Sequence, residues 1–480
     1  MDEDTPTPRR PSRRRPDRSR PRPAGAPRGP LWRRRRLRAL LTPARVIPLG
    51  FLAAIAVGTV ALLGPWAVAA GQAPDGVPFV TAVFVATSAV CVTGLTLVET
   101  GTYWSTTGQT LILAMIHVGG LGIATISALL ALAVTRRLGL QSRIAAGMAT
   151  RVGTIADARS VLVGILRTTL VVEAAVALVL TLRFALHHGE PPGRALWLGV
   201  FHAVSAFNNA GFSLFRENAL YDYATDEWVT GPIMVAIVLG GLGFPVVLEV
   251  LRRTRLPWSV NTRLVLIGTA VLLVGGTLAF LVLEWDNPST LGGVQGSDKL
   301  WTAVFLSVTA RTAGFNTVDY GQVSDASLFL TNALMFVGGG SAGTAGGIKV
   351  GTMAVLVAAV LAEARGDTDA DVFGRRIGPE TIRQALAVIG LYLAVVGTAT
   401  TLLLHLSGER MADVLFEVIS ATATVGLSTG ITPDLPPGGD WVLIVCMFLG
   451  RLGPVTVAGA LALRERARLF RLPETRPLIG

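Results

Sequence analysis

The chain contains the segment SAVCVTGL at Ser88 to Leu95 and repeats its pattern three more times. The further copies are SAFNNAGF at Ser205 to Phe212, TARTAGF at Thr309 to Phe315 and SATATVGL at Ser420 to Leu427. Each copy runs from small residues into a tripeptide that ends in glycine and then into a large apolar residue. Because each copy also lies between two long apolar stretches, the pattern indicates one membrane unit that is repeated four times along the chain.

The repeated glycine suggests a role for the backbone. A loop that turns its carbonyl oxygens toward an axis needs backbone angles that side chains resist and that glycine adopts easily. Irregular backbone at membrane depth is tolerated only where it lines a water-filled or ion-filled path. A single such glycine is more often a helix-packing residue, but four equivalent copies favour a ring of carbonyls, which can replace the hydration shell of a cation.

We therefore predict a selectivity filter that is built from the four tripeptides. Its ion-binding residues are Val92, Thr93, Gly94, Asn209, Ala210, Gly211, Thr312, Ala313, Gly314, Thr424, Val425 and Gly426. The fourth tripeptide reproduces the first three letters of the TVGYG filter of potassium channels. The other three differ from it, so the ring should be less symmetric than that of a tetramer. Potassium at this filter is the metal ion that we expect.

Composition indicates a polytopic membrane protein. Of the 480 residues, 51% are hydrophobic and only 15% are charged, against about 25% charged in soluble domains. The mean hydropathy is +0.57. We find no nucleophile with a base, no carboxylate pair and no nucleotide fingerprint, so we expect neither an enzyme nor a cofactor in this chain.

Residues 1–45 form a distinct, Arg/Pro-rich tail. They contain 15 of the 42 basic residues but only four of the 31 acidic ones, which leaves 27 of each in the rest of the chain. The tail has too few apolar residues to fold, and we predict that it is disordered and cytoplasmic. Beside a transmembrane helix, such a cluster favours contact with anionic lipids over nucleic acid.

Eight apolar segments are near the roughly 20 residues needed to span a bilayer as a helix. They are residues 47–70, 108–135, 160–186, 228–251, 263–285, 326–362, 382–406 and 439–463. Four shorter segments end at the glycine motifs and are expected to be re-entrant half-helices, at residues 78–90, 194–207, 297–310 and 410–422. The predicted fold is an all-α integral membrane protein with four helix–pore-loop–helix repeats around a central pore. The repeats cover residues 46–135, 155–252, 260–363 and 378–470.

Arginine placement predicts the topology. Arginines cluster after the second, fourth, sixth and eighth spans, for example at Arg136, Arg252 and Arg365. By the positive-inside rule these connections and both termini are cytoplasmic. Every glycine motif then lies in the half of the membrane that is reached from outside.

The repeats, with TARTAGF in the third and ATVGLS in the fourth, resemble the Trk/Ktr/HKT superfamily of potassium transporters over residues 45 to 470. They are most similar to the Ktr-type membrane subunit, since nothing before residue 45 supplies the additional transmembrane pair of the Trk type. The resemblance implies potassium uptake across a bacterial plasma membrane by a homodimer with one pore in each subunit. It also implies a cytoplasmic ring of nucleotide-binding regulatory subunits on a separate chain.

A second motif follows each filter glycine. It reads GGLG at Gly119 to Gly122 and at Gly240 to Gly243, and GRLG at Gly450 to Gly453. In the third repeat the matching position opens the run GGGSAGTAGG at 338–347. Six glycines in ten residues cannot remain a firm helix, because each costs roughly 1 kcal/mol relative to alanine. A phosphate loop is excluded because no Gly-Lys-Ser/Thr follows.

We predict that this break is a gate rather than a packing seam. Its residues are Gly338, Gly339, Gly340, Ser341, Gly343, Thr344, Gly346 and Gly347, together with Arg451. Arg451 replaces the second glycine of the motif and should lie at the depth of the loop. An arginine inside a span marks an ion path or a buried partner. The hypothesis is that Arg451 contacts carbonyls of the loop and forms a barrier below the filter, and the family has an arginine at the matching position.

Other polar residues are weaker candidates. Arg311 is expected to brace the third filter strand, and Asn208 and Asn209 to brace or line the second. Glu99 and Asp319 could concentrate cations at the mouth, although a solvated loop charge is the commoner explanation.

The competing function is a proton-coupled or sodium-coupled carrier. Such carriers have inverted repeats and ionisable residues at the midplane, whereas here the repeats are parallel and the spans hold few acids. A sensor module without conduction is a third reading. The sequence leaves open whether sodium activates transport.

Overall fold

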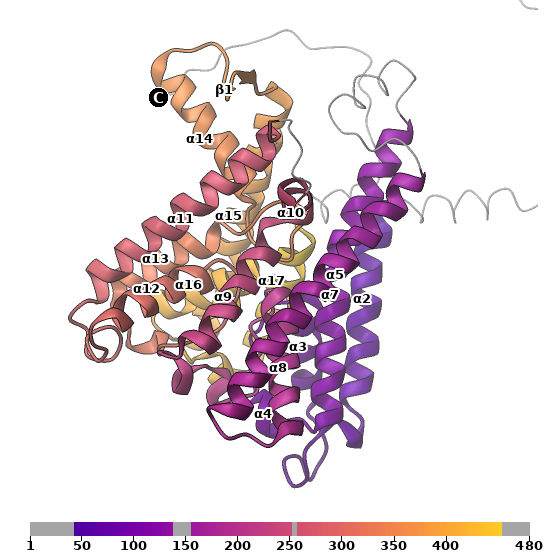
Figure 1. Ribbon diagram of the computed structural model, residues 1–480, viewed down its shortest axis with the longest axis vertical. Coiled ribbons are helices and arrows are strands. Elements are labelled where there is room, and N and C mark those ends of the chain that lie inside the picture. Colours follow the sequence, from indigo (N-terminus) through magenta and orange to yellow (C-terminus); the bar gives the residue numbers. More distant parts are fainter. Residues whose placement is uncertain (1–42, 138–154, 252–256, 454–480) are drawn as a thin grey trace, which may run out of the picture. The chain divides into compact units, whose positions relative to one another are not determined.

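The computed structural model describes residues 43–137, 155–251 and 257–453. Almost all of the predicted tail, and residues 454–470 of the predicted fourth repeat, lie outside the described residues. Within this part of the chain nearly all regular structure is helical, as predicted. Figure 1 shows the helices in sequence colours.

Helices lie at the predicted apolar segments. The first predicted repeat contains α2 (Pro43–Leu62), α3 (Phe79–Cys91) and α5 (Thr106–Arg137). The second contains α7 (Ile155–Leu186), α8 (Pro192–Phe207), α9 (Glu227–Leu242) and α10 (Phe244–Leu251). The third contains α11 (Val260–Glu284), α12 (Ser297–Thr309), α13 (Asp325–Phe336) and α14 (Val350–Arg365). The fourth contains α15 (Pro379–Ser407), α16 (Met411–Ala423) and α17 (Gly439–Leu452).

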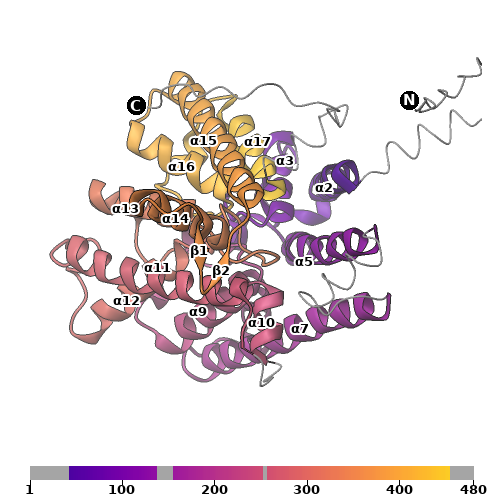
Figure 2. The ribbon, with the colours of Figure 1, turned by 90° about the horizontal axis from the view of Figure 1, so that it is seen from above.

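The four groups of helices follow one another around a common centre (Figure 2). The short helix of each group packs against a later helix of the preceding group, in the pairs α5 with α8, α9 with α12 and α13 with α16. The last pair, α17 with α3, joins the fourth group to the first and closes the circle. This cyclic packing brings the C-terminal ends of α3, α8, α12 and α16 toward one another.

Three helices in the described part of the chain are long and apolar enough to cross a membrane. They are Leu162–Leu186 within α7, Val260–Glu284 and Pro379–Ser407, and α9 with α10 makes a fourth if the bent pair is one span. Large apolar side chains on α11, such as Val271 and Val282, are exposed, as lipid-facing residues of a spanning helix are. The predicted total of eight spans stays a prediction.

Two of the predicted spans are interrupted. The break predicted at 338–347 is present and slightly longer, because α13 ends at Phe336 and α14 begins at Val350. The segment 228–251 was expected to be continuous, which is wrong: α9 ends at Leu242 and α10 leaves it at an angle of 102°. Gly243 at the corner has φ +89°, an angle that residues with a Cβ rarely adopt.

A few short elements complete the described structure. The connections hold the one-turn helix α4 (Thr100–Tyr103) and five 3₁₀ turns: η1 (Pro65–Ala67), η2 (Arg216–Asn218), η3 (Tyr221–Tyr223), η4 (Tyr320–Gln322) and η5 (Thr432–Asp434). Strands β1 (Asp371–Val372) and β2 (Arg375–Arg376) form an antiparallel hairpin between α14 and α15. Both turn residues, Phe373 and Gly374, have positive φ, which is the type I′ geometry of two-residue hairpins.

A charged cluster joins the helices of the second group at the ends of the spans, around Asp226, which lies just outside them. Asp226, the N-cap of α9, accepts hydrogen bonds from Arg183 Nε at 2.9 Å and from the Trp228 amide at 3.0 Å. His188 Nε2 lies 2.8 Å from its Oδ2. Burial raises the pKa of Asp226, but these hydrogen bonds outweigh it and hold the pKa below the ordinary value.

Because of this cluster, the stability of the protein should depend on pH. A carboxylate whose pKa is lowered by folding contributes stability above its unfolded pKa of about 4 and loses it as the pH falls through the folded value. The melting temperature of the purified protein should therefore fall below about pH 4. The Asp226→Asn protein should have a lower melting temperature than the wild type at pH 7. Its melting temperature should also decrease less on acidification, as measured by fluorescence in detergent. The same acid decrease in both proteins would contradict this role.

Candidate functional site

The four filter tripeptides follow directly after the ends of α3, α8, α12 and α16. All twelve predicted filter residues are buried. The structure therefore brings together at one place residues that are up to 334 positions apart in sequence, from Val92 to Gly426.

The backbone of the tripeptides is unusual in the same way in each copy. Their glycines have positive φ, at Gly94, Gly211, Gly314 and Gly426. The first residue of each tripeptide also has positive φ, at 56° for Val92, 56° for Asn209, 68° for Thr312 and 49° for Thr424. Three of these four residues are β-branched, for which this region is an outlier. Such strain, of order 1–3 kcal/mol per residue, persists only where the surroundings enforce it and is typical of functional sites.

The tripeptides form a closed ring. A Cβ atom placed on Gly94 would lie within 3 Å of the Ala210 carbonyl oxygen, and one on Gly211 within 3 Å of that of Ala313. In the same way Gly314 faces the Val425 oxygen, and Gly426 faces the Thr93 oxygen of the first copy. Each copy thus contacts the next in cyclic order, which makes the second and fourth copies opposite each other.

The hydrogen bonding of the carbonyl oxygens in this ring is unusual. Among the described residues, no amide or side chain donates a hydrogen bond to a carbonyl oxygen of the twelve filter residues. Buried carbonyls are normally hydrogen-bonded. A ring of neutral oxygens that is left unpaired suits a dehydrated monovalent cation, which accepts such ligands in place of water.

Hydroxyl groups at the start of each copy are hydrogen-bonded to the backbone of the loops. This role was not predicted from the sequence. The Ser88 and Ser420 hydroxyls accept hydrogen bonds from the amides of Gly94 at 3.0 Å and Gly426 at 3.1 Å. The hydroxyls of Ser205 and Thr309 instead donate to the carbonyls of Phe212 at 2.8 Å and Phe315 at 2.7 Å. The signal was present, since every copy begins with serine or threonine.

The first glycine of the second motif allows a long helix to pack closely against the short helix that precedes the filter tripeptide. A Cβ on Gly119, Gly240 or Gly450 would overlap the carbonyl oxygen of Val90, Phe207 or Thr422, respectively, near the end of the preceding pore helix. Close helix packing therefore accounts for the first glycine of this motif in three repeats. In the third repeat the chain does not continue as a helix but forms the loop 337–349.

This loop lies against the filter loops from below and touches two opposite copies. The Thr344 hydroxyl donates toward Asn209 Oδ1 at 2.9 Å and the Phe207 carbonyl at 3.1 Å, in the second copy. A Cβ on Gly346 would overlap Thr424 Oγ1 and the Ala423 carbonyl of the fourth copy. The Ser341 side chain is exposed at the far end of the loop.

Backbone hydrogen bonds attach the loop to the broken end of α9. The Gly340 amide donates to the Gly241 carbonyl at 2.7 Å, and the Thr344 amide donates to the Gly240 carbonyl at 3.1 Å. The two ends of the loop also pair with each other, since the Gly338 amide donates to the Ile348 carbonyl at 2.9 Å. The loop is thus an ordered element that is hydrogen-bonded to its neighbours, not a continuation of the helix.

Arg451 lies at the depth of the loop and bonds to it. Its Nη1 donates to the Thr344 carbonyl at 2.6 Å, and its Nη2 donates to the Gly119 carbonyl of α5 at 3.0 Å. The residue is only 5% exposed, and its Nε has no hydrogen-bond partner within the described residues. Arg451 therefore connects the third-repeat loop with a helix of the first repeat.

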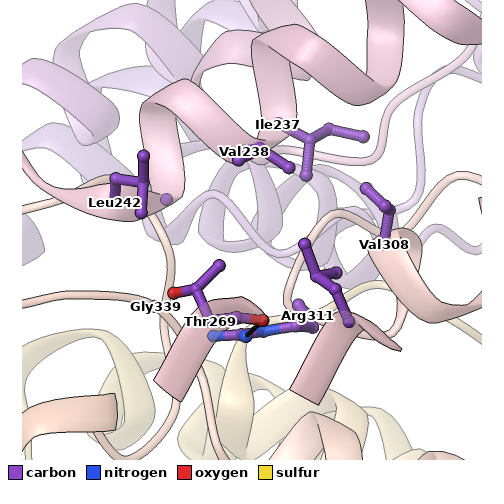
Figure 3. Close-up of a pocket in the computed structure, with 9 residues that line it drawn as sticks. Ile237, Val238, Leu242, Thr269, Val308, Arg311 and Gly339 are labelled. Atoms are coloured by element: carbon purple, nitrogen blue, oxygen red, sulfur yellow. Dashed lines mark hydrogen bonds between the residues drawn. The ribbon is translucent and has the colours of Figure 1, made fainter. Parts of the chain in front are cut away.

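Two more cations hold the loop. Arg311 was expected to brace the third filter strand, but its Nη2 donates to the Gly338 carbonyl at 2.6 Å and its Nη1 to the Thr269 carbonyl of α11 at 3.4 Å. Figure 3 shows Arg311 beside Thr269 and Gly339, at a largely apolar cavity of about 20 Å³. Lys349, which the sequence analysis did not name, donates through Nζ to the carbonyls of Ala345 and Gly346.

The weaker candidates lie at the margins of the site. Asn208 donates through Nδ2 to Glu173 Oε1 of α7 at 3.0 Å and braces the second copy from behind. Glu99 accepts a hydrogen bond from the Glu217 amide at 3.1 Å. Asp319 caps the short turn η4 through the Gly321 amide at 2.9 Å. The two acids therefore have local structural partners in the outer connections.

The sequence is similar to those of known cation transport proteins. The family model described as "TrkH: Cation transport protein" matches residues 70–471. The Ktr system potassium uptake protein B of Bacillus subtilis is 37% identical over 440 residues, which are 92% of this chain and 97% of that protein. The potassium/sodium uptake protein NtpJ of Enterococcus hirae is 35% identical over 456 residues, 93% of this chain and 99% of that protein.

A solved structure shows the same fold. The potassium transporter TrkH from Vibrio parahaemolyticus superposes with a TM-score of 0.70 at 18% sequence identity, over 88% of this chain and 86% of that chain. The resemblance seen in the sequence is thereby confirmed, and the helical chain is a multi-pass membrane protein. The family consists of cation transporters, not of enzymes, and this chain belongs to the TrkH family of cation transport proteins.

Proposed function

We propose that this protein takes up potassium ions across the bacterial plasma membrane through the ring of four filter tripeptides. The ring of buried, unpaired carbonyl oxygens is the observation that carries the proposal. Close relatives are named potassium uptake proteins, which supports potassium as the transported ion. The predicted repeats, re-entrant half-helices and cytoplasmic termini belong to the same proposal.

The proposal includes a gate, the loop 337–349 with Arg451. The loop contacts the second and fourth filter copies, and Arg451 ties it to the first repeat. The loop thus contacts the second and fourth repeats directly and is linked to the first through Arg451. Several of its hydrogen bonds go to neighbouring elements, namely α9, the second filter copy and Arg451. The loop can therefore move when those bonds exchange, as switching loops do.

Partners form a further part of the proposal. The relatives' names describe a protein of a "Ktr system", which supports a separate regulatory component. We propose a homodimer of this chain with a cytoplasmic ring of nucleotide-binding subunits, and contact of the Arg-rich tail with anionic lipids. Size-exclusion chromatography with light scattering would test the dimer, since a monomer in detergent and in nanodiscs would contradict it.

Cation flux into liposomes tests the central claim. Purified protein should admit potassium and rubidium at least about tenfold faster than sodium, the ratio that a binding difference of 1.4 kcal/mol provides. Empty liposomes and liposomes with the Gly426→Ala protein are the controls. Equal potassium and sodium flux would refute the selectivity of the filter.

Sodium is the specific alternative to examine. One relative is named a potassium/sodium uptake protein, so sodium is a candidate activator or second substrate. A coupled carrier would show potassium flux that depends on a sodium or proton gradient. Potassium flux driven by the potassium gradient alone, with sodium absent and pH equal, would favour the pore over the coupled carrier.

A further inference from the structure

Glu417 is a fully buried carboxylate behind the filter that the proposed function does not use. It lies on α16, nine residues before Gly426. Its Oε1 accepts hydrogen bonds from the Ser428 hydroxyl at 2.6 Å and the Thr429 amide at 2.9 Å, and its Oε2 accepts one from the Thr432 hydroxyl at 2.7 Å. None of the ion pairs among the described residues includes it.

His202 occupies the same position in the second copy. It lies on α8, nine residues before Gly211, and is also fully buried. Its Nδ1 lies 2.8 Å from the Leu198 carbonyl, so Nδ1 carries the proton and Nε2 is the acceptor. Nε2 accepts from the Leu214 amide at 3.3 Å and lies 3.2 Å from the Ser213 hydroxyl.

Glu417 and His202 bond to equivalent residues in two filter loops that face each other across the ring. Ser213 and Ser428 are each two residues after the filter glycine, and Leu214 and Thr429 are each three after it. We call residues 213–214 and 428–429 the outer legs of the second and fourth copies. These two copies are opposite each other in the ring. At each of them a polar side chain of the pore helix is hydrogen-bonded to the outer leg.

The first and third copies are fastened differently. Their pore helices carry Val85 and Phe305 at the corresponding positions, which cannot accept a hydrogen bond. Instead, Asn218 reaches across from the connection after the second copy. Its Nδ2 donates to Thr96 Oγ1 at 3.0 Å, and its Oδ1 accepts from the Thr100 amide at 2.7 Å. The Leu220 amide donates to the Asn316 carbonyl of the third copy at 2.6 Å.

We propose that Glu417 is a positioning residue that sets the potassium-over-sodium preference by fixing the outer leg of the fourth filter copy, with His202 doing the same for the facing copy. This inference rests on the proposed filter. A carboxylate acceptor makes shorter and stronger hydrogen bonds than a neutral group. It therefore holds residues 428–429 firmly, which keeps the ring from contracting around a smaller ion.

Glu417→Gln is the direct test, because glutamine keeps the shape and removes the charge. Its sodium flux should rise relative to potassium, so that the potassium-to-sodium ratio falls about tenfold, the factor that loss of one hydrogen bond to a charged group gives. Ser428→Ala and Ser213→Ala, which leave Glu417 in place, should lower the ratio by less. The flux ratio is the decisive measurement, because a merely structural change would lower both fluxes together.

Glu284 provides a matched control. It is equally buried, and its carboxylate accepts hydrogen bonds from Asn287 Nδ2 at 2.6 Å and from the hydroxyls of Thr290 and Ser324 at 2.7 Å each. These partners lie in the outer connections rather than in an outer leg. Glu284→Gln should leave the flux ratio unchanged, even if it lowers the melting temperature.

The outcomes separate the two proposals. If wild-type protein has no potassium preference, the proposed filter fails. If the wild type prefers potassium and Glu417→Gln retains the wild-type ratio, the positioning role is refuted. An equal decrease in the Glu284→Gln protein would also refute it. Should Glu417→Gln not fold, an unchanged ratio in both Ser428→Ala and Ser213→Ala would overturn the inference.

Discussion

Gly426→Ala is expected to abolish potassium uptake. Gly426 has φ +95°, and an added Cβ would overlap the Thr93 carbonyl oxygen and approach the Gly94 Cα. Both are backbone atoms of the adjoining loop, which cannot rotate away as a side chain does. The left-handed angle adds of order 1–2 kcal/mol of strain for alanine, so the ring must open at the contact between the fourth and first copies.

The measurements are potassium flux in reconstituted liposomes and the rise in melting temperature that we expect potassium binding to cause in the wild type. The Gly426→Ala protein should lose both, since a ligand stabilises only a protein that binds it. Gly390→Ala is the control: Gly390 lies in α15 and an added Cβ would meet nothing within 4 Å. That control should be stabilised by roughly 1 kcal/mol. Wild-type flux in the Gly426→Ala protein would contradict the ring.

Arg451→Ala should raise potassium flux. The substitution removes two charge-assisted hydrogen bonds, to Thr344 of the loop and to Gly119 of α5, and with them a positive charge below the filter. Each such bond contributes about 1.5–3 kcal/mol, and a shift of 1.4 kcal/mol changes the ratio of open to closed loop about tenfold. We therefore expect initial flux at least about tenfold above wild type.

Arg451→Lys is the matched variant for this test. Lysine keeps the charge but cannot bond both carbonyls with a planar fork, so its flux should lie between those of wild type and Arg451→Ala. Melting temperature reports folding in each case. Unchanged or lower flux in a well-folded Arg451→Ala protein would contradict the barrier.

The helices and the glycine-rich break were predictable because composition alone encodes them. Long apolar runs define the helices, and no helix of 338–347 could absorb six glycines. The corner at Gly243 had a weaker signal. The preceding GGLG motif also occurs at Gly119 to Gly122, where the helix α5 continues without a break. The difference is the proline at position 245. It has no N–H to donate to the Gly241 carbonyl, and its ring would clash with that carbonyl in a continuous helix.

The strained residues and the buried anchors could not be predicted in the same way. Nothing local distinguishes Val92 or Thr424 as residues with positive φ, since β-branched residues avoid that region. Their conformation is imposed by contacts with the neighbouring copies and the pore helices. Arg311 was recognised as a brace, but its partner, Gly338, is 27 residues away. Glu417 and Lys349 needed the fold to show what surrounds them.

The contact between Gly426 and the Thr93 carbonyl closes the ring within a single polypeptide. In a tetrameric channel every substitution is present four times, so its effect cannot be divided among the subunits. In this protein each quarter of the proposed filter is encoded separately and can be altered alone, in pairs or in triples. A graded series from one to four altered quarters would measure directly whether their contributions to ion choice add or cooperate.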